Sequence, residues 1–392
     1  MINVVIVGGG ASGIMCALHL SKLSSNFNIT ILEKQDRIGK KLLVTGNGKC
    51  NLTNKYITKN NYNHPEFIDS LLNKFSFEEC QKYFSKLGLL FQTDDVGRSY
   101  PYSESAKAFL DLLMYHLEKG KVNIKTNCEV IDVVPACKGY LVKTNDKEYF
   151  ADVIVFASGG QASINFENKT YQILQKLNHT IIPIYPGLVP LKVKENLKHL
   201  HGVRVKAQAS LIKDHQVLTI KNGEVQFRSD SLSGIVIFEL SSIYNRLPQK
   251  NNVFVSLDLM PNYTLEEIYD LLFSKKQSGF SNEEVLIGLF NKMIIWELNN
   301  RIKNKSNYLR ELTTLIKDFR FTVINSNSLN EAQVTLGGID INEITTNFES
   351  IYHPNMFIIG ELLDIDGDTG GYNLHFAWLS GIICANNIYK KF

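Results

Sequence analysis

An apolar strand that runs into a glycine-rich loop and then into a helix constrains this chain more than any other feature. Residues 4–7 are a β-branched run typical of a buried parallel strand, and residues 8–13 read Gly-Gly-Gly-Ala-Ser-Gly, which fits G-x-G-x-x-G. A helical pattern over 14–23 and a second strand at 29–32 follow, and that strand ends directly at Glu33. This order and spacing predict a dinucleotide site in a Rossmann-like α/β domain. The motif alone does not separate FAD from NAD.

Each part of the loop has a mechanical role in such a site. Gly8 permits the tight turn, Gly10 lets the backbone approach a pyrophosphate, and Gly13 lets helix and strand pack closely. The N-terminus of the helix that follows the loop offers free N–H groups and a partial positive charge, which favour phosphate. A carboxylate at the end of the second strand would accept hydrogen bonds from a ribose diol and repel a 2′-phosphate.

Segments near both ends of the chain resemble one known family. Residues 46–51 read Gly-Asn-Gly-Lys-Cys-Asn, residues 360–364 read Gly-Glu-Leu-Leu-Asp, and residues 370–374 read Gly-Gly-Tyr-Asn-Leu. Together they resemble the HI0933-like proteins, which include BaiN-type and aminoacetone-oxidase-like NAD(P)/FAD-dependent oxidoreductases. The resemblance implies FAD as the cofactor and NAD(P)H as a possible transient reductant. It also implies a discontinuous FAD-binding domain of the glutathione-reductase type, with an inserted antiparallel β-barrel-like module and a small helical module.

The C-terminal motif fits FAD on physical grounds as well. The apolar strand before Gly360 brings the Glu361 carboxylate to a strand end, where a ribityl hydroxyl could meet it. Gly370 and Gly371 open a helical pattern over 373–389. A helix N-terminus at the flavin pyrimidine edge would stabilise negative charge on reduced flavin.

Motif and resemblance together predict a set of cofactor-binding residues. They are Gly8, Gly10, Ala11, Ser12, Gly13, Glu33, Lys34, Lys41, Gly46, Asn47, Gly48, Cys50, Asn51, Val130, Ala157, Ser158, Gly159, Gly360, Glu361, Asp364, Gly370, Gly371, Tyr372, Asn373 and Leu374. Within the resemblance, the backbone of Val130 would pair with adenine, and Ser158 stands where a threonine is usual. Cys50 has no second cysteine at CxxC spacing, so we interpret it as a packing residue rather than half of a dithiol.

The catalytic residues are not identified by the sequence. His375, Tyr372 and Arg98 are the candidates, and a surface ion pair is an equal alternative for Arg98. The family usually has a histidine shortly before a Leu-Ser-Gly stretch, whereas this chain reads Arg-Ser-Asp-Ser at 228–231. Whether this change alters activity stays open, and it puts the transfer of substrate specificity in doubt.

We predict five segments along the chain: an FAD-binding part at 1–186, a barrel-like domain at 187–261, a helical domain at 262–320, a return strand at 321–335 and a second FAD-binding part at 336–392. Residues 62–120 look mainly helical. Asn222-Gly223 between two apolar runs predicts a hairpin turn. Capping boxes at Thr264 and Ser281 predict helices, and an apolar stripe from Leu286 to Trp296 is interpreted as core.

Composition excludes several classes of protein. A net charge of +3 is too small for a dedicated nucleic-acid binder, so no nucleic-acid partner is expected. No apolar run approaches about 18 residues, so no membrane span is expected. Six cysteines without paired spacing and an N-terminus without a leader indicate a cytoplasmic protein with reduced thiols and no metal site. The oligomeric state is open.

Three functions are consistent with these features. The first is an FAD-dependent, NAD(P)H-linked oxidoreductase that acts on a small organic substrate, such as an enone, held between the flavin and the inserted domain. The second is a flavin oxidase of small amines or aminoketones that uses O2. The third is a non-catalytic flavin-binding redox sensor. No second G-x-G-x-x-G is found, so a dedicated nicotinamide domain is not expected.

Overall fold

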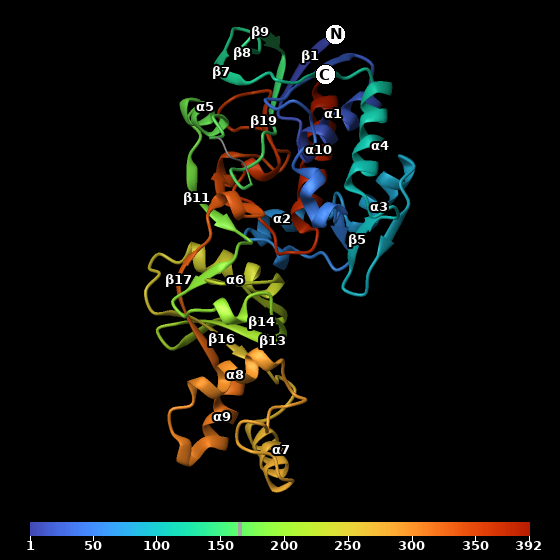
Figure 1. The fold of residues 1–392 in the computed structure, drawn as a ribbon. Helices are drawn as coiled ribbons and strands as arrows, with labels where there is room; N and C mark the ends of the chain where they lie inside the picture. The colour runs from blue at the N-terminus through green and yellow to red at the C-terminus, as the bar shows by residue number, and fades with distance from the viewer. Residues whose placement is uncertain (164–166) are drawn as a thin grey trace. The chain divides into compact units, whose positions relative to one another are not determined.

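The chain forms two compact units in the computed structural model, which describes residues 1–163 and 167–392 (Figure 1). The first unit comprises Met1–Tyr185 together with Val334–Phe392, and the second comprises Pro186–Gln333. Each unit has its own hydrophobic core. The first unit is therefore discontinuous in sequence, with the second inserted into it.

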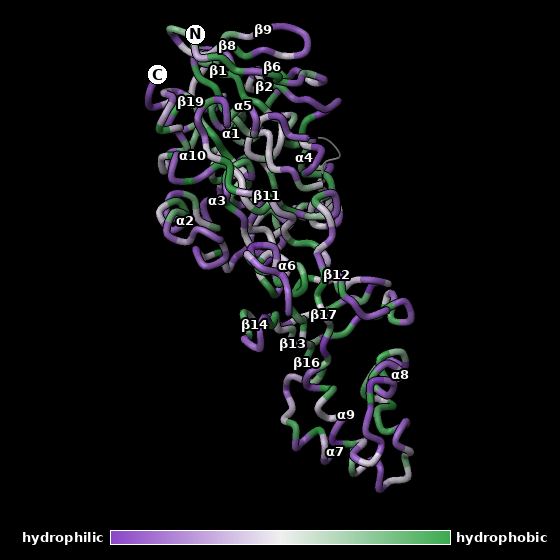
Figure 2. Tube along the Cα trace, turned by 90° about the vertical axis from the view of Figure 1, so that its left-hand side faces the viewer, coloured by the Kyte–Doolittle hydropathy of each residue, from purple (hydrophilic) through white to green (hydrophobic). Residues whose placement is uncertain are grey.

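A five-stranded parallel sheet with the order β19-β10-β1-β2-β6 is the centre of the first unit. Its strands are β1 (Ile2–Val7), β2 (Phe27–Leu32), β6 (Asn123–Lys125), β10 (Val153–Phe156) and β19 (Met356–Ile358). The trace of β1 is hydrophobic in Figure 2, and Val4 and Ile6 are fully buried. Both faces of β1 are covered, which explains why its sequence is continuously apolar rather than alternating. The predicted Rossmann-like α/β fold is confirmed.

Two helices from opposite ends of the chain pack side by side in the first unit (Figure 1). They are α1 (Ala11–Leu23) and α10 (Tyr372–Lys391). A Cβ on Gly381 of α10 would lie 2.7 Å from the backbone oxygen of Ser12, so this glycine permits the close approach. The N-termini of both helices thereby belong to one compact unit.

Smaller elements complete the first unit. Its other helices are α2 (Pro65–Leu72), α3 (Phe77–Lys86), α4 (Ala106–Lys119) and α5 (Thr170–Lys176). One three-stranded sheet has the order β7 (Val130–Pro135), β8 (Tyr140–Thr144) and β9 (Glu148–Ala151). A second has the order β3 (Thr53–Asn54), β5 (Arg98–Pro101) and β4 (Phe91–Thr93). In a two-stranded sheet, β11 (Ile181–Gly187) pairs with β18 (Val334–Ile339). The region predicted as mainly helical thus also contains β4 and β5.

The second unit is a closed six-stranded barrel with four helices. The barrel order is β12 (Leu191–Val193), β15 (Ser231–Ser233), β14 (Gln216–Phe227), β13 (Arg204–Lys213), β16 (Val253–Asp258) and β17 (Phe319–Ser326). The helices are α6 (Ile235–Arg246), α7 (Leu265–Gln277), α8 (Lys292–Arg301) and α9 (Tyr308–Lys317). The predicted antiparallel barrel is confirmed, and all its strand pairs are antiparallel.

The predicted hairpin turn at Asn222-Gly223 is wrong. Strand β14 runs straight through these residues, and the turn lies at Asp214-His215, whose φ angles of 47° and 68° are those of a tight hairpin. Gly223 instead makes room for helix α6, because a Cβ there would lie 2.9 Å from a methyl group of Val236. Gly223 therefore allows α6 to pack on the barrel and does not form a turn.

The predicted helix after Ser281 is also wrong. The Glu284 carboxylate does accept the Ser281 N–H at 2.9 Å, but residues 281–290 form turns. Gly288 has a φ of 86°, which interrupts helical geometry, and helix α8 starts only at Lys292. Trp296, at the end of the stripe that was expected in the core, is 51% exposed, whereas Leu286 at its start is fully buried. The capping box at Thr264 is present and opens α7.

Candidate functional site

The glycine-rich loop leaves space above the start of helix α1. A Cβ on Gly8 would lie 2.6 Å from the backbone oxygen of Ala157, and a Cβ on Gly13 would lie 2.1 Å from that of Gly8. At Gly10, by contrast, no atom of the described part of the chain would lie nearer than 3.9 Å to such a Cβ. No side chain caps α1, so the N–H groups of Ala11 and its neighbours face this space. The loop can therefore receive an anion such as a pyrophosphate.

The Glu33 carboxylate organises the loop at the end of β2. Its two oxygens accept the N–H groups of Gly9 and Gln35, both at 2.8 Å. Each carboxylate oxygen can accept a further hydrogen bond. Glu33 thus holds the loop in shape, and its carboxylate can still accept hydrogen bonds from ribose hydroxyls.

Three charged residues meet beside the start of β7. Lys34 and Lys169 lie 2.9 and 3.4 Å from the Glu129 carboxylate. Burial opposes ionisation of Glu129, but these two cations outweigh it and lower its pKa. The cluster fixes the backbone just before Val130, which is buried at the first position of β7.

An ion pair joins the two ends of the first unit. Lys41 Nζ lies 2.7 Å from Glu361 Oε2, and Glu361 Oε1 accepts the N–H of Thr335 at 2.8 Å. The Thr335 hydroxyl in turn accepts the N–H groups of Gln161 and Ala162. Two predicted cofactor residues separated by 320 positions are therefore brought together. No motif marks Thr335, because nothing in the sequence distinguishes a single threonine at the start of a strand.

The loop after β10 is held by a residue that the sequence analysis missed. Asn168 donates to the backbone oxygen of Gly159 at 2.7 Å and to the Ser158 hydroxyl at 3.2 Å. Gly159 has a φ of 73°, and no atom of residues 1–163 and 167–392 lies within 4 Å of the Cβ it lacks. Among these residues the loop therefore leaves space beside its backbone here, as at Gly10.

The loop over residues 45–51 adopts an unusual backbone. Gly46, Asn47, Gly48 and Cys50 all have φ between 55° and 83°. Cys50 is buried, and burial raises its pKa to about 12, so the thiol stays protonated. This supports our interpretation of Cys50 as a packing residue. Asn51 carries a buried Oδ1 with no hydrogen-bond partner among the described residues.

The loop before α10 packs against that segment. A Cβ on Gly371, whose φ is 105°, would lie 2.6 Å from the backbone oxygen of Thr53 and 2.8 Å from Asn51 Oδ1. Asn373 fixes the loop by exchanging hydrogen bonds with the backbone of Gly367 at 2.8 and 2.9 Å. No side chain caps α10, so its N-terminus is also open. Tyr372 and Leu374 lie in its first turn.

His375 is engaged at both ring nitrogens. Nδ1 lies 2.8 Å from the Thr53 hydroxyl, and Nε2 lies 3.0 Å from the backbone oxygen of Phe75. The ring is fully buried, and burial lowers its pKa to about 4. This geometry argues for a neutral structural histidine rather than the catalytic one considered from the sequence.

The other two catalytic candidates also have protein partners. Arg98 Nε donates to the Asp94 carboxylate at 2.8 Å, which is the ion pair considered as its alternative role. The backbone oxygen of Tyr372 accepts the hydroxyl of Tyr62 at 2.9 Å. These contacts do not identify either residue as a catalytic acid or base.

Asp364 has a partner that the sequence analysis did not name. His64 Nε2 lies 3.1 Å from its Oδ2, and the Asn63 amide donates to its Oδ1 at 3.2 Å. His64 is about one-third exposed. A lone histidine before a proline carries no sequence signal for this contact.

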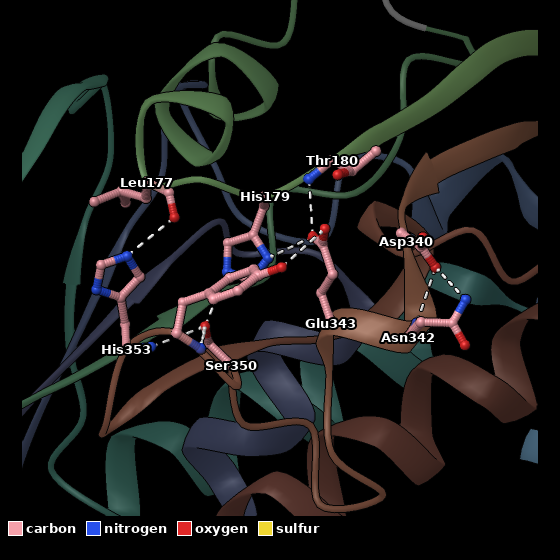
Figure 3. Close-up of polar contacts among 9 residues, drawn as sticks. Leu177, His179, Thr180, Asp340, Asn342, Glu343, Ser350 and His353 are labelled. Carbon is pink, nitrogen blue, oxygen red and sulfur yellow. Dashed lines mark hydrogen bonds and ion pairs between the residues drawn. The ribbon is translucent and has the colours of Figure 1, made fainter.

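A serine, a histidine and a glutamate, none of them among the predicted cofactor residues, form a buried cluster (Figure 3). His179 Nδ1 lies 3.2 Å from Glu343, and its Nε2 lies 2.9 Å from the Ser350 hydroxyl. The spacing is that of a hydrolase triad, but Ser350 Oγ also accepts two backbone N–H groups, and the His179 side chain is fully buried. Glu343 also accepts the N–H of Thr180. The cluster therefore ties the start of β11 to the segment before β19.

A cavity of about 560 Å³ lies between residues 36–48 and helix α4. Its wall is mainly apolar, with Ile38, Leu110 and Met114. Gly48 is the only predicted cofactor residue that lines it. The cavity therefore does not coincide with the set of residues described above.

These residues fit a dinucleotide. Open space at Gly10 and Gly159, free helix N-termini and the unpartnered Asn51 oxygen are features that a bound FAD would use. Among residues 1–163 and 167–392, no cluster of histidine, cysteine or acidic side chains could hold a metal ion.

The profile described as "HI0933-like protein Rossmann domain" matches residues 2–387. The chain belongs to the HI0933-like family. It is 32% identical to a 3-dehydro-bile acid delta(4,6)-reductase of Clostridium scindens, over 98% of each chain. It is 26% identical to a ribosomal RNA dihydrouridine synthase of Escherichia coli, again over 98% of each chain. The HI0933-like chain is thus a Rossmann-fold flavoprotein oxidoreductase by family.

Solved structures agree with this fold. A flavocytochrome c3 fumarate reductase in its open conformation matches with a TM-score of 0.51 and 13% identity, over 99% of this chain and 78% of that one. The 3-ketosteroid delta1-dehydrogenase of Sterolibacterium denitrificans matches with a TM-score of 0.51 and 12% identity over the whole of both chains. In the described part of the HI0933-like chain, no helix has the length and apolar character needed to cross a membrane.

Proposed function

We propose that this chain is an FAD-dependent reductase that adds two hydrogens across a C=C bond conjugated to a carbonyl group, with NAD(P)H as the electron donor. The observation that carries the proposal is the shared chemistry of its full-length relatives. Reduction of a 3-dehydro bile acid at delta(4,6) and formation of dihydrouridine both saturate a ring C=C bond activated by a carbonyl. The family therefore supports a reaction type more firmly than a substrate.

The residues of the first unit would hold FAD in a defined order. The N–H groups at the start of α1 would bind phosphate, and Glu33 would accept ribose hydroxyls. Glu361, which is paired with Lys41, would accept a hydrogen bond from a hydroxyl of the ribityl chain. The positive end of α10 would favour charge on the reduced ring. When bound, FAD supplies the hydride, and the protein positions it and tunes its electron affinity.

A small enone is the substrate class that we favour. The relative that acts on a bile acid is more similar than the relatives that act on ribosomal RNA, at 32% against 26% identity. A net charge of +3 also offers little attraction to RNA phosphates. Uridine in RNA remains the second candidate, because two relatives carry that name. The expectation of no nucleic-acid partner therefore stays a prediction.

The test starts from the purified protein with FAD bound. NADH or NADPH is added without oxygen, and loss of the flavin absorbance is followed; a 3-oxo-4,6-diene steroid or ribosomal RNA is then supplied. We expect bleaching by one nucleotide, reoxidation by the steroid and a product heavier by two hydrogens. Failure of both nucleotides to bleach the flavin, together with bleaching by a small amine, would favour the oxidase and refute the proposal.

A matched variant shows whether the glycine loop holds the cofactor. Gly10→Val places a side chain in space that is open in the structure, and Gly10 has an extended backbone that valine accepts. We expect the melting temperature of the FAD-free protein to stay unchanged while FAD is no longer retained. Unchanged FAD retention would contradict the assigned phosphate site.

A further inference from the structure

The hydroxyl of Tyr171 is buried without a partner. Tyr171 lies in the first turn of α5 and is 6% exposed, and its hydroxyl makes no hydrogen bond to any described residue. Leaving such a group unpaired is unfavourable, so most buried hydroxyls in proteins have a partner. The Tyr171 hydroxyl is therefore free to donate to a ligand that binds beside it.

Two carboxylates of the predicted site act on this hydroxyl. Burial raises the pKa of Tyr171, and the charges of Glu361 and Asp364 raise it further. The hydroxyl therefore stays protonated and is available to donate a hydrogen bond.

The same carboxylates restrict what Tyr171 can bind. Glu361 is paired with Lys41, and Asp364 is paired with His64. Neither carboxylate accepts a hydrogen bond from the Tyr171 hydroxyl. Their negative charges disfavour an anionic group such as phosphate at this point. The acceptor that fits is an uncharged hydroxyl or carbonyl oxygen.

We propose that the Tyr171 hydroxyl donates a hydrogen bond to an uncharged oxygen of bound FAD, beside Glu361 and Asp364. Tyr171 is then a cofactor-positioning residue that no sequence motif singled out. This inference rests on the proposed function, because it requires that the first unit binds FAD. It adds a contact from α5 to those made by the glycine loop and by the C-terminal motif.

The test compares Tyr171→Phe with two matched controls. Tyr83 and Tyr244 also carry buried hydroxyls without a partner among the described residues, so Tyr83→Phe and Tyr244→Phe make the same chemical change elsewhere. The FAD dissociation constant is measured by quenching of flavin fluorescence, and the melting temperature is measured on the FAD-free protein. We expect about tenfold weaker FAD binding for Tyr171→Phe, equivalent to about 1.4 kcal/mol, and no change for the controls.

The melting temperature gives the second readout. Removing an unpaired buried hydroxyl leaves stability unchanged or raises it, so the FAD-free Tyr171→Phe protein should melt no lower than the wild type. A lower melting temperature would mean that the hydroxyl already has a partner, such as a buried water, and would overturn the inference. FAD binding equal to the wild type would overturn it as well. If the wild type itself binds no FAD, the proposed function fails first, and this inference fails with it.

Discussion

His375 makes the stability of the first unit depend on pH. Its ring is fully buried, and its pKa is lowered by burial from 6.5 to about 4. The folded state therefore holds His375 neutral in a pH range where the unfolded chain binds a proton. Its contribution is fully present above pH 6.5 and is lost as the pH falls toward 4.

The magnitude follows from the two pKa values. Between about pH 7.5 and about pH 5, proton binding to the unfolded chain removes about 2 kcal/mol of stability through this one side chain. His375→Gln cannot be protonated, so its stability should fall by about 2 kcal/mol less over the same interval. Burial also lowers the pKa values of the partly buried His19 and the buried His179, but these two residues contribute equally to both proteins. The difference between the proteins isolates His375.

The two tryptophans allow a clean assay. Trp378 lies in α10, is fully buried and donates to the backbone oxygen of Leu52, whereas Trp296 lies in the second unit. In a Trp296→Phe background, urea unfolding followed by fluorescence reports on the first unit alone. Wild-type-like and His375→Gln proteins are compared at both pH values. An equal loss of stability in the two proteins would refute the assignment of a neutral buried histidine.

Three further predictions follow from contacts of the first unit. Glu343→Ala leaves buried donors unpaired and should lower the free energy of unfolding by about 2–5 kcal/mol in urea; a loss below about 0.5 kcal/mol would contradict the role of the cluster in Figure 3. Gly371→Ala and Gly88→Ala both place alanine at positive φ, at 105° and 95°, but only the first also meets a backbone oxygen at 2.6 Å. Gly371→Ala should therefore lower the melting temperature more and reduce FAD binding, and equal effects would argue against this packing. With a maleimide, Cys137 should react quickly and Cys50 only after unfolding, as mass spectrometry can check; rapid labelling of Cys50 would be inconsistent with its burial.

Local sequence patterns correctly predicted those helices and strands whose formation depends on nearby residues. The strand and helix around Gly8 to Gly13 are where they were expected, because burial and backbone geometry require those residue types. At Asn222-Gly223 the same reasoning failed, since Gly223 is needed for the close approach of α6. The Ser281 capping bond formed without a helix, because Gly288 adopts a conformation that a helix does not allow.

In the candidate site, too, the sequence predicted local features but not contacts between distant residues. The sequence named Lys41 and Glu361 separately, but no pattern links residues 320 positions apart, and only the fold pairs them. Thr335 and Tyr171 were missed because a single hydroxyl carries no motif. His375 was considered for catalysis from its place near Gly371, and burial, which depends on tertiary packing, gave it a different environment.

The discontinuity of the first unit has a consequence for its synthesis. β1 pairs with β10, but β10 needs β19, which follows only after the 148 residues Pro186–Gln333 have been made. About 200 residues separate the end of β10 from β19, so at about 5–20 residues per second the edge of β10 waits roughly 10–40 s, and α1 waits longer for α10. During that time the nascent chain presents an unpaired parallel edge, which is a site for mispairing. The second unit, which is continuous in sequence and closes its own barrel, can fold meanwhile, so we expect chaperones on the ribosome to engage residues 1–185 rather than the insertion.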